Sequence, residues 1–356
     1  MRSTPRFLPA LALLAALCAA PVLSAQDRVS FDNVISRVST VPAGTSGDRG
    51  TDKAQDKARE QGWRPSSPLA AAPADRQPAE DSVLRAQVLL DRAHFSPGEI
   101  DGANGTNTKR AITAFQESRG LDASGALDEA TWAELDKDDA PTLVQYEITE
   151  DDADGPFFDI PGDMMEKAKL DRLGYESLEE MLGERFHASP GLLAKLNEGG
   201  LDAGATVLVP NVFGGEPLAR ADKVVVDKSD GSVSLVDAGG EVYARYPATS
   251  GSEHDPLPIG DWKIQGVARE PTFHYSPDLF WDADPSHSKA TIPPGPNNPV
   301  GMVWIDLSKE HYGIHGTPEP STIGKTQSHG CIRLTNWDAI AVAAAVAPGM
   351  TAELQP

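Results

Sequence analysis

The distribution of large apolar residues along the chain sets the strongest limit on how it can fold. Residues 26–80 contain few of them and carry Pro65, Pro68, Pro73 and Pro78. Such a stretch cannot bury enough apolar surface to offset its conformational entropy, so it is predicted to be a flexible tether. The rest of the 356 residues is long enough for two or three small domains, and the chain is expected to be multi-domain.

Residues 1–25 have the pattern of a secretory signal peptide, with a basic start, an apolar run too short to span a bilayer, and small residues before a cleavage point near Ala25. Cleavage would remove Cys18 and leave Cys331 as the only cysteine of the mature chain. A lipidated Cys18 is the less favoured alternative, because bulky Leu17 stands directly before it. The protein is therefore expected to be exported.

The formal net charge of -22 argues against nucleic acid as a partner, and no basic run suggests binding to anionic lipid. After the signal peptide there is no run of about eighteen apolar residues. The mature chain is therefore expected to have no membrane span.

Residues 81–137 show the spacing of two or three short helices around a small core. Apolar residues recur at helical spacing over residues 84–93 and 111–115, and the turn-rich "SPGEIDGANG" lies between them. The stretch, with its "IDGANGTNT" and "AFQESRGL" segments, resembles the peptidoglycan-binding domain of cell-wall enzymes. The resemblance implies that most matching residues are structural and that the loop 101–108 contacts the wall.

Residues 138–165 are strongly acidic and are expected to be a solvated linker, because no calcium-loop spacing is present. Residues 166–213 contain two helical faces followed by a strand in "AGATVLVPN". That order, with "LAKLN" before the strand and "VPN" at its end, resembles a LysM carbohydrate-binding module, although an opening strand is not recognisable. Glycan binding and a spacer role both stay open.

Residues 222–352 change to strand signals, with alternating segments separated by Asp-Gly and Gly-Gly turns. Near their end, "SHGCIRL" places Cys331 shortly before a helix that Thr335 or Asn336 can cap. On an extended backbone, Cys331 and Arg333 would share one face, while the two apolar residues of "CIRL" enter the core. Arg333 could then lower the pKa of the thiol or hold a substrate carboxylate, or it could form only a surface ion pair.

An unpaired thiol in an oxidising compartment is a liability unless it is used, so a nucleophile is favoured over a buried Cys that acts as a small hydrophobe. A nucleophilic cysteine normally needs a base. His329 is two residues away but would share the face of Cys331 only on a fully extended backbone. His315 ends a strand-like segment and precedes a Gly and a Thr-Pro turn, so His315 is the preferred base.

The segment "IHGTPEPSTIGKTQSHGCIRLTNWDA" resembles the signature of YkuD-type L,D-transpeptidases, and upstream similarity extends the resemblance over residues 222–350. The family implies that Cys331 attacks an amide carbonyl, that His315 transfers the proton, and that the Gly316 carbonyl orients the imidazole. It also implies that His329 and Gly330 surround the oxyanion region. Together with the nucleophile these form the expected catalytic set.

The same resemblance implies a substrate and a compartment. The substrate would be a peptidoglycan tetrapeptide stem cut before its terminal D-alanine, and the compartment would be the periplasm, at the cell wall. An amine of a neighbouring stem would resolve the thioester to give a 3-3 cross-link, without any cofactor or metal. A D-amino acid, an outer-membrane protein or water could replace that amine.

Arg333 and Ser328 are expected to shape the acyl-donor site. The long, Pro-rich stretch 268–296 is expected to be a lid, in which Tyr275 and Trp281 either line the donor groove or pack the loop onto the domain. The expected fold is a mainly β, sandwich-like catalytic domain preceded by a small helical peptidoglycan-binding domain and a small α+β LysM-like unit.

Three rival functions have less support. Ser286 begins an S-x-x-K pattern, but the accompanying S-D-N and K-T-G motifs of penicillin-binding proteins are absent. A zinc hydrolase could use His315, His329 and Cys331, yet no H-E-x-x-H motif occurs. A non-catalytic wall-binding scaffold would not need the intact nucleophile, base and flanking glycines.

Overall fold

We analysed a computed structural model that describes residues 63–65 and 68–356. The predicted signal peptide and most of the predicted tether lie outside the described residues. None of the described helices is long and apolar enough to cross a membrane.

The first helical unit contains α3 (Val83–Arg92), α4 (Thr106–Ser118) and α5 (Glu129–Leu135). Ser82 caps α3 by accepting the Arg85 N–H, which satisfies one of the free donors at the helix start. Apolar residues on the facing sides of the three helices are buried together, as the helical spacing predicts. The expected helical unit is confirmed.

A three-stranded antiparallel sheet follows, in the order β1 (Ala70–Ala71), β2 (Leu143–Glu147) and β3 (Thr206–Pro210). Helices α8 (Leu178–Arg185) and α9 (Pro190–Leu196) cover it, and short helices α6 (Glu150–Asp154) and α7 (Met164–Lys167) lie in the connection from β2 to α8. Its apolar core also contains Val88 and Ile100 of the helical unit.

Strand β2 lies inside the stretch 138–165 that the sequence suggests is a solvated linker, so the structure differs from that expectation. Leu143, Val144 and Tyr146 are buried, and β2 pairs along its whole length with β3. The acidic residues on both sides conceal this short apolar segment in the sequence. The end of the expected tether differs too, because β1 pairs with β2.

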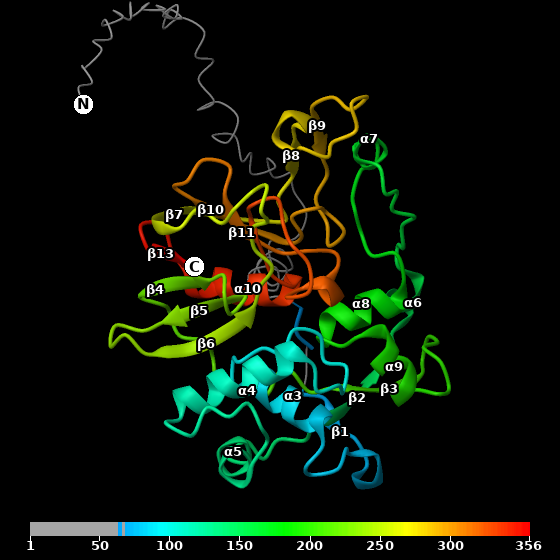
Figure 1. The fold of residues 1–356 in the computed structure, drawn as a ribbon. Helices are drawn as coiled ribbons and strands as arrows, with labels where there is room; N and C mark the ends of the chain where they lie inside the picture. The colour runs from blue at the N-terminus through cyan, green and yellow to red at the C-terminus, as the bar shows by residue number, and fades with distance from the viewer. Residues whose placement is uncertain (1–62, 66–67) are drawn as a thin grey trace, which may run out of the picture. The chain divides into compact units, whose positions relative to one another are not determined.

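The C-terminal part of the chain is built on an eight-stranded sheet in the order β12-β11-β10-β7-β13-β4-β5-β6 (Figure 1). Its strands are β4 (Lys223–Asp227), β5 (Ser232–Val236), β6 (Val242–Pro247), β7 (Gly260–Arg269), β10 (Val303–Leu307), β11 (Gly313–His315), β12 (Ile332–Arg333) and β13 (Thr351–Gln355). Helix α10 (Asn336–Ala345) packs its apolar residues into the same core as the strands. The mainly β class is confirmed.

The expected lid stretch contains a separate two-stranded hairpin. Strand β8 (Phe273–Tyr275) pairs antiparallel with β9 (Ala290–Ile292), and apolar residues of this hairpin pack with Leu173 and with residues around α7.

Helix α10 begins where the sequence predicts, because Thr335 caps it by accepting the Asp338 N–H.

Candidate active site

Strands β11 and β12 bring the two halves of the histidine and cysteine motif side by side. They are parallel neighbours, with Ile314 opposite Ile332 and His315 opposite Arg333. Both isoleucines are fully buried in the core of the domain. Because side chains alternate along a strand, His315 and Arg333 project from the other face of the sheet.

Cys331 directly precedes β12 and is half-buried. Its Sγ lies 3.5 Å from the carbonyl oxygen of His311. Burial raises the pKa of the thiol, while the backbone N–H of Gly313 and the charge of Arg333 act in the opposite direction. The net shift is upward, so Cys331 rests as a neutral thiol.

His315 is 4% exposed and its ring is fixed on two sides. Nδ1 lies 2.7 Å from the carbonyl oxygen of Gly316, which can only accept, so Nδ1 carries the proton and Nε2 is the free basic nitrogen. Trp304 stacks on the ring with centroids 5.5 Å apart. Burial, followed by the charge of Arg333, lowers the pKa of His315 to about 3, which keeps the resting imidazole neutral.

Gly316 lies against Asn336, the first residue of α10. A Cβ at Gly316 would overlap Oδ1 of Asn336. The Gly316 N–H donates to the carbonyl of Val303 at 3.2 Å. Gly316, whose carbonyl is the acceptor for His315, is therefore bonded to the sheet and packed against the helix.

The segment around Cys331 also depends on glycine geometry. Gly330 has φ +102°, which disfavours any residue with a Cβ, and a Cβ there would lie 2.8 Å from the Tyr312 ring. Ser328 is buried and its Oγ donates to the carbonyl oxygen of Cys331 at 2.6 Å. Ser328 thus fixes the backbone of Cys331.

The remaining residues named from the sequence occupy the lid stretch or face it. His329 Nε2 contacts Asp282 Oδ1 at 2.9 Å, and its ring lies edge-on to Phe280. Trp281 is 63% exposed and stacks on His254 with centroids 4.6 Å apart. His329 therefore faces the lid, whereas His315 lies opposite Arg333 on the sheet.

Tyr275 is 5% exposed and belongs to the small core beneath the hairpin. Its hydroxyl contacts His287 Nδ1 at 2.9 Å, and His287 Nε2 contacts Asp163 at 2.8 Å. Tyr275 therefore packs the hairpin against residues 160–173, which lie outside the catalytic domain.

Sequence reasoning missed Asn336 as a partner of the site, although it named Asn336 as a helix cap. It also missed Trp304, Tyr312 and Asp282. Trp304 lies beside His315 because the two residues are register partners in β10 and β11. The alternation of side chains along a strand, which predicts the orientation of His315, also applies to Trp304. The other two lie in loops, where no periodic pattern identifies them.

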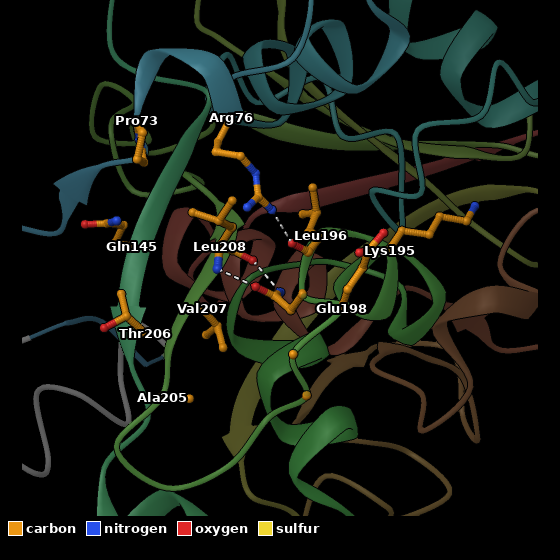
Figure 2. A pocket seen from close by; sticks show the side chains of 13 residues that line it. Pro73, Arg76, Gln145, Lys195, Leu196, Glu198, Ala205, Thr206, Val207 and Leu208 are labelled. Carbon is orange, nitrogen blue, oxygen red and sulfur yellow. Dashed lines mark hydrogen bonds between the residues drawn. The ribbon is translucent and has the colours of Figure 1, made fainter.

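A cavity of about 550 Å³ lies elsewhere, beside β2, β3 and the end of α9 (Figure 2). Arg76 lines it and donates to the carbonyl of Leu196 at 2.8 Å. Asn197 contacts Leu208 twice, as acceptor from its N–H at 2.7 Å and as donor to its carbonyl at 2.9 Å. Asn197, from the LysM-like "LN" pair, thus joins α9 to β3.

Two family models match the chain. Residues 221–354 match the L,D-transpeptidase catalytic domain, YkuD, and residues 79–135 match a putative peptidoglycan binding domain. The C-terminal part is therefore an L,D-transpeptidase catalytic domain of the YkuD family, an acyltransferase family. The two domains associate this enzyme with peptidoglycan and the cell wall.

Named relatives agree with the family match. The chain is 28% identical over 196 residues to a putative L,D-transpeptidase YkuD of Bacillus licheniformis, which covers 55% of this chain and 96% of the relative. It is 26% identical over 174 residues to a probable L,D-transpeptidase YbiS of Escherichia coli. The aligned region covers 47% of this chain and 54% of that relative.

Solved structures of L,D-transpeptidases are also similar. The enzyme from Mycobacterium smegmatis is 21% identical at a TM-score of 0.31, over 44% of this chain and 75% of that chain. The enzyme from Xylanimonas cellulosilytica is 17% identical at a TM-score of 0.34, over 82% of this chain and 98% of that chain.

Within the described residues, no group of three or more His, Cys, Asp and Glu side chains could hold a metal ion.

Proposed function

We propose that the protein is a cysteine-dependent L,D-transpeptidase that acts on peptidoglycan tetrapeptide stems and forms 3-3 cross-links. The observation that carries the proposal is the hydrogen bond from His315 Nδ1 to the Gly316 carbonyl at 2.7 Å, on the strand beside the cysteine segment. It leaves Nε2 free to act as a base. Arg333, in register with His315, supplies a cation for a substrate carboxylate.

In the first half-reaction, Cys331 Sγ attacks the carbonyl carbon before the terminal D-alanine, and its proton passes to His315 Nε2. Backbone N–H groups near Gly330 and Cys331 stabilise the oxyanion, a contribution of about 3 kcal/mol for each donor. The amide C–N bond breaks as the imidazolium returns the proton to the leaving amine. The products are a thioester on Cys331 and free D-alanine.

In the second half-reaction, an amine attacks the thioester carbonyl, and a new amide forms as the C–S bond breaks. One proton of the amine passes through His315 to the departing sulfur, which restores the thiol. The reaction conserves the number of amide bonds and needs no external energy source. A side-chain amine of a neighbouring stem gives the 3-3 cross-link.

Export by a cleaved signal peptide, a periplasmic location and wall contact through the loop 101–108 belong to the same proposal. The LysM resemblance of the unit around β2 and β3 is supported by α8 and α9 lying between these two paired strands, although the short helices α6 and α7 also lie there and β1 adds a third strand. We infer that it contacts glycan near the cavity of Figure 2. A loss of sacculus binding after Lys195→Ala or Thr206→Ala would support this role.

The test is the mass spectrum of products after the protein is mixed with purified disaccharide-tetrapeptide, with Cys331→Ala as the control. Dimers lighter by one D-alanine than two monomers, absent from the control, are the expected result. Tripeptide without dimer would favour a carboxypeptidase, or an enzyme that needs a protein or D-amino acid acceptor. Equal results for both proteins would favour a non-catalytic scaffold.

A further inference from the structure

We propose that Glu184, which lies in α8 outside the catalytic domain, is a positioning residue that acts on His315 through Asn336 and the Gly316 carbonyl. The inference rests on the proposed role of His315 as the base. The orientation of His315 then depends in part on a residue that lies outside the catalytic domain.

Asn336 is the centre of this arrangement and is completely buried. Its Oδ1 accepts the N–H of Met302 at 3.0 Å. Its Nδ2 donates to the carbonyl of Pro296 at 3.2 Å and to Oε1 of Glu184 at 3.0 Å. The side-chain amide therefore uses both donor hydrogens and its oxygen within the protein.

The oxygen end of this amide lies against Gly316. A Cβ at Gly316 or at Gly301 would overlap Asn336 Oδ1, so neither glycine leaves space for the amide to move toward it. The carbonyl of Gly316 in turn accepts from His315 Nδ1. Any displacement of the Asn336 amide is transmitted to the acceptor that sets the orientation and the tautomer of the imidazole.

Glu184 and the Pro296 carbonyl decide which way the Asn336 amide faces. Both offer acceptors to Nδ2, so they keep the nitrogen on their side and the oxygen toward Met302. Burial raises the pKa of Glu184 to about 8, and a carboxyl group offers an acceptor oxygen in either protonation state.

Helix α8 and the segment that precedes it make further hydrogen bonds to the loop that contains Pro296. Glu180 Oε1 accepts from Asn297 Nδ2 at 2.7 Å, and Asn297 Nδ2 also contacts the carbonyl of Gly174 at 2.9 Å. The N–H of Leu173 donates to the carbonyl of Pro294 at 2.9 Å. Glu184 therefore reaches Asn336 from a helix whose preceding turn and N-terminal connection are hydrogen-bonded to residues 294–297.

The experiment compares Glu184→Ala and Glu184→Gln with Glu179→Ala, a control at an exposed position of the same helix. Two rates are measured: acylation by disaccharide-tetrapeptide in a single turnover, and alkylation of Cys331 by iodoacetamide at several pH values, followed by mass mapping of its peptide. We expect Glu184→Ala to slow acylation about tenfold at saturating substrate with little change in KM, and to change the pH profile of alkylation. Glu184→Gln, which keeps an acceptor oxygen, should restore both.

Acylation by Glu184→Ala equal to that of Glu179→Ala would overturn the inference, and so would a loss that appears only in KM or in sacculus binding. Where Glu184→Ala does not fold, Glu184→Asp provides the same comparison, because its shorter side chain cannot hold the 3.0 Å contact. If the unaltered protein forms no acyl-enzyme, the proposed function fails, while the alkylation profile still tests the effect of Glu184 on the base. An unchanged profile then overturns the inference by itself.

Discussion

The contact between Gly316 and Asn336 leads to a sharp prediction about Gly316→Ala. The new methyl group would overlap Oδ1 of a buried asparagine that makes three hydrogen bonds. Over-packing typically costs about 1–3 kcal/mol, and each displaced hydrogen bond adds about 1 kcal/mol. We expect the free energy of unfolding to fall by about 2–4 kcal/mol, measured by urea denaturation.

The same substitution should reduce acylation more than stability alone would explain. The Gly316 carbonyl is the acceptor for His315 Nδ1, and misplacement of a catalytic group by about 1 Å can cost about 100-fold in rate. Single-turnover acylation of the folded variant should fall by about that factor.

Gly266→Ala is the matched control, because Gly266 lies in β7 of the same sheet and a Cβ there meets nothing within 4 Å. Asn336→Ala combined with Gly316→Ala should cost about 1–2 kcal/mol less than the sum of the two single changes, since the smaller side chain makes room for the methyl group. A loss for Gly316→Ala no larger than that for Gly266→Ala, or strict additivity with Asn336→Ala, would refute the reasoning.

Three other predictions follow from the site and its surroundings. Burial raises the pKa of Asp338 to about 7, above the value of about 3.9 in an unfolded chain, so folded protein retains a proton that the unfolded chain loses. Stability should therefore decline as pH rises from about 4 to about 7, and Asp338→Asn should flatten that slope in urea denaturation; identical slopes would contradict the assignment. The low pKa of His315, about 3, predicts no imidazole inflection in the acylation rate between about pH 5 and pH 7, and a midpoint near 6.5 would show a solvated ring. Gly330→Ala should slow acylation at least about tenfold. Adding Tyr312→Ala should not restore the rate, because the backbone of residue 330 at φ +102° stays unfavourable for alanine after the Tyr312 ring is removed. A full recovery of the rate would show that the effect is purely a clash with that ring.

Much of the catalytic domain could be predicted because its signals are local. Alternation in "CIRL" predicts that Ile332 and Leu334 enter the core, and both are fully buried. Of the two caps that the sequence offers, Thr335 and Asn336, the structure uses Thr335. Both signals arise from backbone geometry within a few residues, which sequence patterns record directly.

The accessory parts were harder to predict because their signals are long-range. Strand β2 forms because it pairs with β3, whose partner residues lie 59 to 67 positions later along the chain, and its acidic flanks outweigh its short apolar pattern. Ser328 could be placed near the nucleophile, but its donation to the Cys331 carbonyl depends on loop geometry. The contact of Glu184 with Asn336 joins residues 152 positions apart, and a single sequence holds no record of such a pair.

The parallel pairing of β11 with β12 has a consequence for engineering. Two short strands fix the separation of His315 and the cysteine segment, whatever the length of the chain that connects them. Lys325, Thr326 and Gln327 in that connection are exposed, so a peptide tag or a new pair of termini placed there should leave the reactive pair in register. The connection could thus be lengthened without rebuilding the paired strands beneath it.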